Sequence, residues 1–236
     1  MRLDKYLVEK GYFESRNRAL DAIKRGKVFV DGIVVAKASY KCDERTTIDI
    51  DQEKFYVSRA SKKLELFLEE YGIPLKGKLA LDIGSSTGGF VQILLENDVA
   101  SVTCVDVGSN QLHHSLRGKS RVEVFEETDI RDFSSDNQFD VVTCDVSFIS
   151  ILQILEAIDR LAKADMILLF KPQFEVGRNV KRDSRGVVVN QEAIAEAKSN
   201  FEVKSKELGW QQLYETTSKL AGKSGNIEYI YHFRKV

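Results

Sequence analysis

The chain has 236 residues, of which 43% are hydrophobic and 30% charged, and its formal net charge at pH 7 is −1. This composition is typical of a soluble globular protein, and it shows no overall basic excess of the kind that indicates a nucleic-acid partner. The three cysteines lack CxxC spacing, and the longest apolar run is far shorter than the roughly 20 residues that cross a bilayer. We therefore expect a cytoplasmic protein with no disulfide framework, no metal site and no membrane segment.

The first part of the chain predicts two short helices followed by a β-hairpin. LDKYLVEKGY (3–12) and SRNRALDAIKRG (15–26) have helical spacing and glycines at or near their ends, and Ser15 is an N-cap candidate. Asp31-Gly32 within VFVDGIVV (28–35) is a strong signal for a type I′ turn, and TTIDI (46–50) could add a third strand. These elements predict a small α+β domain over residues 1–56.

This domain is locally basic. Residues 1–41 carry ten Lys or Arg against five Asp or Glu, a net charge of +5. Such a cluster fits either a solvated helix face or a surface that contacts phosphates, whose binding would depend on salt. The candidate RNA contacts are Arg2, Arg16, Arg18, Lys24, Arg25 and Lys27.

Residues 2–50 resemble the small RNA-binding module named after ribosomal small-subunit protein four (the S-four domain). The resemblance rests on the skeleton SR..A...I..G.V.V.G within RLDKYLVEKGYFESRNRALDAIKRGKVFVDG. It implies that the second helix and the loop after it meet structured RNA through shape and backbone contacts.

After an acidic stretch (43–53) and a linker near 52–59, the pattern changes. Residues 58–72 predict a helix with an apolar stripe that ends at Gly72. Apolar strands then alternate with helices. The expected strands are 79–83, 101–107, 121–127, 139–146, 165–170, 210–219 and 227–234, and the expected helices are one running to 97, a short one between 107 and 121, 150–163 and 190–208.

This alternation predicts that residues 57–236 form a Rossmann-like α/β domain with a seven-stranded, mostly parallel sheet. A short segment rich in Gly, Ser and Lys joins the last two strands. They are therefore expected to form an antiparallel hairpin at one edge of the sheet.

The segment DIGSSTGGF (82–90) follows the first strand of this domain, where open α/β sheets bind their ligands. It lacks the Gly-Lys-Ser/Thr of a phosphate-binding P-loop, and Ser86 replaces the second glycine of the dinucleotide motif. A side chain at that position suits a ligand without phosphate and favours S-adenosylmethionine. A tight turn with no ligand is the alternative. The candidate cofactor residues in this loop are Asp82, Gly84, Ser85, Ser86, Thr87, Gly88, Gly89 and Phe90.

Acidic residues lie at or just beyond four successive strand ends: Asp82, Asp106, Asp129 and Asp145. Asp106 is placed to accept ribose hydroxyls, which fits NAD as well as S-adenosylmethionine. Asp129 is placed to meet an adenine edge. Four carboxylates around one site favour a cationic ligand.

Two lysines and a glutamate complete the candidate site. Lys171 lies at the mouth of a buried strand, where a desolvated lysine can act as a general base. Glu228, in the last strand, could hold a lysine in place, whereas Lys63 is also compatible with a solvated lysine. The fourth strand is followed by CDVSFIS and not by the Pro-Pro loop of amino-group methyltransferases, which favours oxygen as the acceptor.

A second basic segment follows Lys171. It contains Arg178, Lys181, Arg182 and Arg185. It fits either a flexible surface loop or an RNA clamp beside the active site.

Taken together, the motifs VSRASKKL, LDIGSSTGGF, VDVGSNQL, CDVSFIS, LLFKPQFEVGR and SGNIEY resemble, in order, those of the TlyA-type (haemolysin A-like) ribosomal RNA 2′-O-methyltransferases of the FtsJ-like class. The resemblance implies a catalytic Lys-Asp-Lys-Glu tetrad at Lys63, Asp145, Lys171 and Glu228, with Lys62 as the neighbour to which the first assignment could slip. It also implies methyl transfer from S-adenosylmethionine to a cytidine 2′-hydroxyl in ribosomal RNA, with the large subunit favoured.

Three rival functions remain at this point: a non-catalytic ribosome-assembly factor, a pore-forming haemolysin and an NAD-dependent oxidoreductase.

Overall fold

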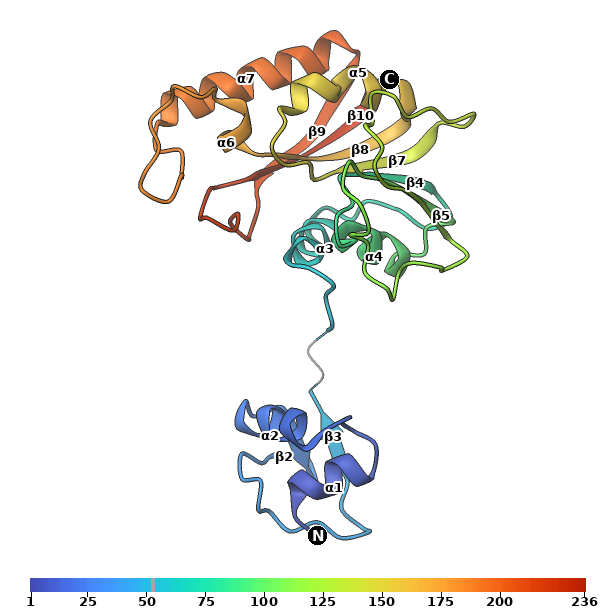
Figure 1. Cartoon of the computed structure of the whole chain (residues 1–236), viewed down its shortest axis with the longest axis vertical. Coiled ribbons are helices and arrows are strands. Elements are labelled where there is room, and N and C mark those ends of the chain that lie inside the picture. The colour runs from blue at the N-terminus through green and yellow to red at the C-terminus, as the bar shows by residue number, and fades with distance from the viewer. Residues whose placement is uncertain (52–53) are drawn as a thin grey trace. The chain divides into compact units, whose positions relative to one another are not determined.

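The computed structural model describes residues 1–51 and 54–236, and the chain divides into two compact units, Met1–Phe55 and Tyr56–Val236 (Figure 1). Residues 52 and 53, which belong to the expected linker, lie outside the described residues. Each unit buries its own apolar cluster, so each is described by itself.

The smaller unit packs two helices against a three-stranded antiparallel sheet of order β2-β1-β3. Its elements are α1 Leu3–Glu9, α2 Arg16–Lys24, β1 Val28–Val30, β2 Ile33–Val34 and β3 Ile48–Ile50. The Ser15 hydroxyl accepts a hydrogen bond from the backbone amide of Arg18 and so caps α2, as expected. Asp31 and Gly32 have φ angles of 51° and 79°, which a type I′ turn requires at both central positions. The predicted hairpin is therefore confirmed.

The larger unit is built on a seven-stranded sheet of order β6-β5-β4-β7-β8-β10-β9. Its strands are β4 Leu79–Ile83, β5 Ser101–Val105, β6 Val122–Phe125, β7 Phe139–Cys144, β8 Ala162–Phe170, β9 Trp210–Thr217 and β10 Tyr229–Lys235. The strands from β6 to β8 run parallel, and β10 is antiparallel to both β8 and β9. The mostly parallel sheet and the antiparallel hairpin at its edge are both confirmed.

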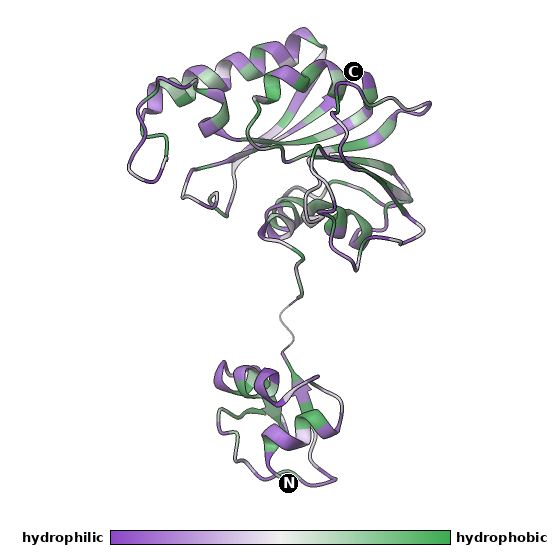
Figure 2. Cartoon of the chain, in the orientation of Figure 1, coloured by the Kyte–Doolittle hydropathy of each residue, from purple (hydrophilic) through white to green (hydrophobic). Residues whose placement is uncertain are grey.

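Helices cover both faces of this sheet (Figure 1). They are α3 Arg59–Tyr71, α4 Gly89–Glu96, the 3₁₀ helix η1 Ile151–Ile154, α5 Leu155–Leu161, α6 Pro172–Glu175 and α7 Gln191–Glu207. One apolar cluster joins α3 and α4 to the sheet, and a second joins α5 and α7 to its other face. Figure 2 shows the hydrophobic strands that lie between helices with mixed surfaces.

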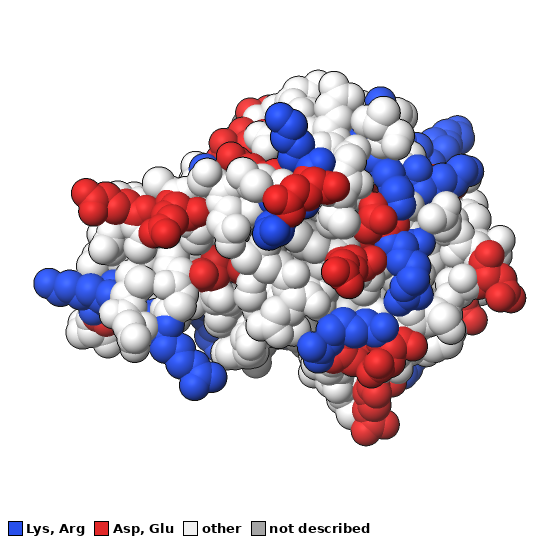
Figure 3. All heavy atoms as spheres, turned by 90° about the horizontal axis from the view of Figure 1, so that it is seen from above, with Lys and Arg blue, Asp and Glu red and all other residues white. Residues whose placement is uncertain are grey.

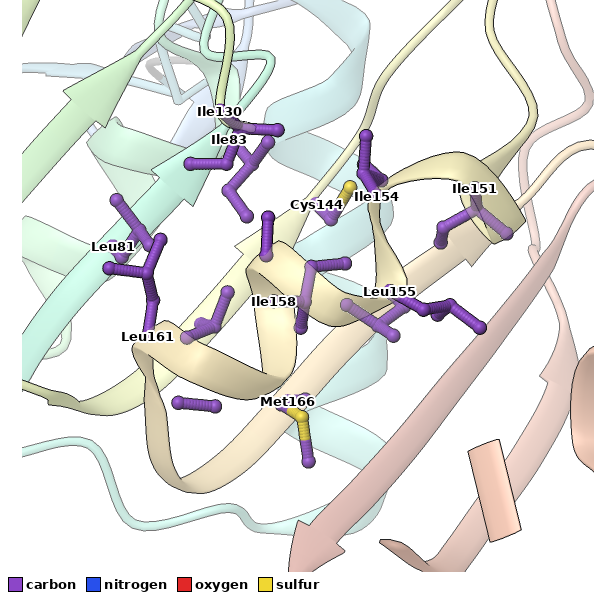
Figure 4. Packing of buried hydrophobic residues seen from close by; sticks show 14 of the residues in the cluster. Leu81, Ile83, Ile130, Cys144, Ile151, Ile154, Leu155, Ile158, Leu161 and Met166 are labelled. Atoms are coloured by element: carbon purple, nitrogen blue, oxygen red, sulfur yellow. The ribbon is translucent and has the colours of Figure 1, made fainter. Parts of the chain in front are cut away.

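Regular apolar spacing explains these helices. In α5, Leu155, Ile158 and Leu161 recur every three residues and point onto the strands, where Figure 4 shows them beside Cys144 and Met166. Helix α3 ends at Gly72, whose φ of 62° is left-handed, as the sequence predicted.

The prediction of a short helix between residues 107 and 121 is wrong, because this segment forms turns. Its backbone wraps around the carboxylate of Glu126, which accepts hydrogen bonds from the amides of Asn110 and Gln111 and from the guanidinium of Arg117. Burial alone would raise the pKa of Glu126, but these donors outweigh it and lower that pKa to about 2. A partly buried anion that takes up backbone amides competes directly with helical hydrogen bonding.

The aromatic cluster under α7 should hold the edge hairpin in place. Phe201 is fully buried, and its ring centroid lies 5.1 Å from that of Tyr231 and 5.6 Å from that of Phe233. Phe201→Ala should lower the free energy of unfolding by about 3–5 kcal/mol, because it leaves a cavity. Urea denaturation measures this change. Val203→Ala on the exposed side of α7 is the matched control and should cost well under about 1 kcal/mol. Equal effects of the two substitutions would contradict this account of the core.

Candidate active site

The loop from β4 to α4 needs glycine at two places for steric reasons. A Cβ at Gly84 would lie 3.1 Å from the Cα of Val146 at a φ of 75°. A Cβ at Gly89 would clash with the hydroxyl oxygen of Ser58. The loop is thus held tightly between the start of α3 and the segment that follows β7. Ser86 adopts a left-handed φ of 46°, and its amide donates a 2.7 Å hydrogen bond to Asp106.

A cavity of about 320 Å³ opens beside this loop at the carboxyl ends of β4, β5 and β7. It is lined by Ile83, Gly84, Ser86, Val105, Asp106, Val107, Gln111, Thr128, Asp129, Ile130, Asp145, Val146, Ser147, Phe148, Ile149 and Ile154. Val107 leaves 72% of its surface exposed, although it is apolar. An apolar wall with carboxylates at its edge fits a nucleoside, whose base is flat and whose ribose donates hydrogen bonds.

The two expected nucleoside-binding carboxylates both line this cavity. The Asp106 carboxylate accepts hydrogen bonds from the amides of Ser86 and Gly108, each at 2.7 Å, so its orientation is fixed. Asp129 pairs with Arg131 at 2.6 Å, and this hydrogen bond lowers the pKa of Asp129. Both the cavity and the fixed carboxylates fit S-adenosylmethionine, whose adenosine end needs these features.

A second cavity, of about 580 Å³, lies next to the first. It is lined by Ser58, Arg59, Ala60, Lys63, Asp82, Gly84, Ser85, Ser86, Thr87, Gly89, Phe90, Asp145, Ser147, Lys171, Ala221 and Lys223. Gly84, Ser86, Asp145 and Ser147 line both cavities. Asp145 therefore lies where a ligand in one cavity would meet a ligand in the other.

The sheet brings the first of two buried ion pairs together at this junction. Asp145 follows β7 and Lys171 follows β8, and these strands are parallel neighbours, so both side chains emerge at the same edge. The Lys171 ammonium lies 2.6 Å from the Asp145 carboxylate and donates a 3.0 Å hydrogen bond to the Ser147 hydroxyl. The two charged side chains are only 8% and 15% exposed.

The second pair joins Lys63 of α3 to Glu228, with 2.5 Å between the ammonium nitrogen and the carboxylate oxygen. Tyr229 of β10 lies opposite Phe170 of β8 in an antiparallel pair. Glu228 precedes Tyr229 and Lys171 follows Phe170, so both residues lie just beyond the same end of this pairing. Lys63 is buried, whereas Lys62 is exposed. Of the two adjacent lysines, Lys63 is therefore the one that lines the second cavity.

Asp82 lies within β4 and not beyond its end, and it is 1% exposed. Its carboxylate accepts a 2.6 Å hydrogen bond from the Thr143 hydroxyl. Burial raises the pKa of Asp82 to about 7, although the hydrogen bonds from Thr143 and Ser85 oppose this shift. Asp82 can therefore change its charge near neutral pH.

Sequence reasoning missed two residues of the site. Ser147 binds the Lys171 ammonium. Phe148 lines the first cavity, is 92% exposed and adopts a left-handed φ of 69°, which is strained for a bulky residue. Both belong to CDVSFIS, a segment in which the sequence singles out Asp145 alone.

The candidate RNA-binding lysines and arginines differ in whether their side chains are bound within the chain or exposed to solvent. In the second basic segment, Arg182 donates to the backbone carbonyl oxygens of Gln173, Gly177, Arg178 and Val180, so it organises the loop. Arg185 pairs with Asp183, whereas Arg178 and Lys181 are exposed. On the face of the larger unit seen in Figure 3, charges of both signs are interspersed.

In the smaller unit, Arg2 and Arg16 both pair with Asp4, and Arg25 pairs with Asp21. Arg18 and Lys24 are exposed, and Lys27 is partly buried. The predicted RNA contacts thus include both organised and solvated side chains.

Comparison with known proteins identifies the family. The FtsJ-like methyltransferase family matches residues 56–235, and the S4 domain matches residues 1–48. The chain belongs to the FtsJ-like methyltransferases. It is 46% identical to the 23S rRNA (cytidine-2′-O)-methyltransferase TlyA of Campylobacter jejuni, with all of both chains covered.

Two further relatives extend this picture. The 16S/23S rRNA (cytidine-2′-O)-methyltransferase TlyA of Mycobacterium tuberculosis is 38% identical over 99% of this chain and 89% of that protein. A solved structure described as a putative hemolysin from Streptococcus thermophilus is 31% identical, with a TM-score of 0.73, covering all of this chain and 88% of the other. The expected family and fold class are confirmed.

Within residues 1–51 and 54–236, no group of three or more His, Cys, Asp or Glu is placed to hold a metal ion. In the same ranges, no helix combines the length and apolar character needed to cross a membrane.

The raised pKa of Asp82 predicts a distinct dependence of stability on pH. Because the folded chain holds this proton up to about pH 7, its contribution to stability is fully present below about pH 4 and is lost as the pH rises through this window. Asp82→Asn removes this loss. Relative to the unsubstituted chain, the free energy of unfolding of the variant should therefore rise by on the order of 3 kcal/mol between about pH 5 and pH 8.

Urea denaturation across this pH range measures the difference. Asp140→Asn is the control, because the hydrogen bond from Lys163 lowers the pKa of Asp140 and places its titration below this range. A parallel pH dependence in the chain with Asp82 and in the Asp82→Asn variant would show that this carboxyl is ionised throughout.

Proposed function

We propose that this chain transfers the methyl group of S-adenosylmethionine to the 2′-hydroxyl of a cytidine in ribosomal RNA, with large-subunit RNA favoured. Residues 1–56 would bind RNA and residues 57–236 would carry out the reaction, in the cytoplasm. The observation that carries the proposal is the buried pair of Lys171 and Asp145 at the junction of two cavities. The 46% identity to a 23S rRNA (cytidine-2′-O)-methyltransferase supports the same reaction.

The first cavity would hold the adenosine part of the cofactor, and its amino-acid end would reach the part of the second cavity that the loop lines. Asp106 would accept the ribose hydroxyls, Asp129 would meet the adenine edge, and the loop from Gly84 to Phe90 would surround the amino-acid end. When bound, S-adenosylmethionine supplies an electrophilic methyl group. Asp145 would add negative charge around its cationic end, and Asp82 would do so only when it is ionised.

The second cavity would receive the target nucleotide, and Lys171 would act on its ribose. The side-chain nitrogen of Lys171 can orient the 2′-hydroxyl. As a neutral amine, it can also take up the proton that the hydroxyl loses. Asp145 and Ser147 fix the position of this nitrogen, so alignment of the attacking oxygen supplies part of the rate. The pair of Lys63 and Glu228 would complete the polar wall.

The target nucleotide must leave its helix to reach this depth, which costs a few kcal/mol. The exposed ring of Phe148 lies at the rim of the first cavity, 5.4 Å from that of Phe174. An exposed aromatic ring at this place can stack on an extruded base and offset part of that cost.

The rival functions are weaker. A relative described as Hemolysin A, from Brachyspira hyodysenteriae, is 39% identical over 99% of both chains. Release of dye from pure lipid vesicles by the purified chain tests membrane lysis directly. A non-catalytic assembly factor would have no need for two buried ion pairs beside a cofactor-sized cavity.

Lys171→Ala should lower methyl transfer by about 10²–10⁴-fold, the usual contribution of a general base, and leave cofactor affinity within about threefold. The measurement is transfer of tritiated methyl to purified small and large ribosomal subunits from a strain lacking the enzyme. Nuclease digestion and mass spectrometry then locate the 2′-O-methylcytidine.

Lys163→Ala is the matched control, because Lys163 lies at the opposite end of β8 and its side chain is 63% exposed. It should transfer methyl groups at the normal rate. No transfer to either subunit by the unsubstituted chain, with cofactor binding intact, would overturn the proposed reaction.

The basic segment after Lys171 should contribute to RNA binding through its exposed cations. Arg178→Glu with Lys181→Glu should weaken subunit binding and reduce its salt dependence, because fewer phosphates are neutralised. Cofactor affinity, measured by calorimetry, should stay the same. Lys204→Glu with Lys206→Glu makes the same charge change at the end of α7 and should have a smaller effect on RNA binding. Equal loss of RNA and cofactor binding would count against a role in RNA contact.

A further inference from the structure

Asp4 is a charged side chain that is completely buried near the start of α1. Its carboxylate binds two arginines from different parts of the smaller unit. Arg2, just before α1, donates through Nε at 3.0 Å, and Arg16, the first residue of α2, donates through Nε and Nη2 at 2.7 and 2.6 Å. The packing of α1 against α2 therefore converges on one carboxylate.

These contacts keep the carboxylate ionised. The hydrogen bond from Arg2 lowers the pKa of Asp4 most, burial opposes it, and Arg16 adds to the lowering, with a resulting pKa of about 2. A buried anion with two cationic partners leaves a net charge of +1 in this group. The cluster is thus still positive toward solvent.

Each of the two guanidinium groups is bound to Asp4 on one side and exposed to solvent on the other. The side chains of Arg2 and Arg16 remain 44% and 51% exposed, although both are bound to a carboxylate with no exposure. The hydrogen bonds to Asp4 use Nε and Nη2 of each arginine, so Nη1 of each is not used by this carboxylate. Planar guanidinium groups with free donors match the geometry of phosphate oxygens.

The arrangement differs from an ordinary surface ion pair. Arg25 also pairs with an aspartate, Asp21, at 3.0 Å, but both of these side chains are 58% exposed. Solvent screens such a pair, and it holds its arginine weakly. A buried carboxylate, in contrast, restricts the rotamers of two long side chains before any ligand arrives, which lowers the entropy cost of binding.

We propose that Asp4 is a positioning residue that holds Arg2 and Arg16 as a preformed clamp for two backbone phosphates of RNA. The inference rests on the proposed RNA substrate. On this account, the affinity of the smaller unit for RNA depends on two arginines that are already held in position, and not only on the net charge of the unit.

Asp4→Asn tests this proposal, because the two explanations predict opposite changes in affinity for RNA. The substitution removes one negative charge from a basic unit, so a mechanism based on charge alone predicts tighter binding to RNA. The clamp predicts the opposite, because the amide group can no longer hold both guanidinium groups. We expect the full-length variant to bind the preferred ribosomal subunit about 5–20-fold more weakly than the unsubstituted chain, a loss typical of a charge-assisted hydrogen-bond network.

Asp21→Asn is the matched control, since it makes the same charge change beside an exposed arginine. It should bind as tightly as the unsubstituted chain or slightly more tightly. Arg16→Lys keeps the charge but removes the planar fork, and it should also weaken binding. Filter binding to purified subunits over a series of salt concentrations gives all of these affinities.

Two controls separate positioning from loss of fold. Cofactor affinity of every variant should match that of the unsubstituted chain, and its thermal unfolding should keep the same cooperative shape. In a chain that already carries Arg2→Ala and Arg16→Ala, Asp4→Asn should weaken binding no further.

The inference fails if Asp4→Asn binds subunits as tightly as the unsubstituted chain or more tightly. It also fails if Asp4→Asn weakens binding equally when both arginines are absent. If the unsubstituted chain binds neither subunit, the proposed RNA substrate itself is wrong, which is a different result.

Discussion

The site depends on the alignment of β7, β8 and β10. Parallel pairing brings the ends of β7 and β8 to one edge of the sheet, and antiparallel pairing places the start of β10 beside them. A shift of one residue in either register would turn Lys171 or Glu228 to the other face. The aromatic core under α7 packs against β10 and includes Phe170, the residue before Lys171, so this packing supports the geometry of the charged groups.

Burying these charges does not stabilise the fold in any simple way. Desolvation of two ions costs several kcal/mol, and their attraction returns this only when the geometry is good. Lys171 is held by both the side chain of Asp145 and the hydroxyl of Ser147, which supplies such geometry. A lysine so fixed loses little further freedom when a substrate hydroxyl arrives, which is what catalysis by orientation requires.

Sequence patterns predicted the parts of the fold that follow from apolar spacing and turn chemistry. The hairpin at Asp31-Gly32, the helix that ends at Gly72 and the alternation of strands and helices all have local signals. The turns of residues 107–121 did not, because they are organised by Glu126, which lies beyond them in the chain and reaches their amides only in the folded state. No spacing rule encodes such a contact.

The candidate site shows the same division. Proximity of Asp145 and Lys171 follows from the topology of a parallel sheet, so it could be inferred once the strands were recognised. The choice of Lys63 over Lys62 needed either the family pattern or the structure, since adjacent lysines differ only in the face of α3 that they occupy. The role of Arg182 within its own loop could not be inferred, because its partners are backbone carbonyl groups, which every residue has.

Buried carboxylates that orient cations recur in this chain, and their surroundings decide what they do. Asp165, near the start of β8, is 2% exposed and binds Lys78, His232 and Arg234. His232 and Arg234 belong to β10, the strand beside β8, whereas Lys78 directly precedes β4, so the cluster joins strands at the end of the sheet opposite the cavities. None of these partners lines either of the two cavities of the site.

Asp145 and Asp4 differ from Asp165 in the setting of the cations that they hold, because Arg234, a partner of Asp165, is 48% exposed but lines neither cavity of the site and has a buried histidine beside it. Lys171 faces a cavity, and Arg2 and Arg16 face solvent with donors unused by the carboxylate. A cation fixed by a buried anion but open on its other side is prepared for an oxygen ligand, a hydroxyl in one unit and phosphates in the other. Burial of the anion alone thus predicts rigidity, and an open side on the cation predicts function only where a cavity or a second exposed arginine lies beside it.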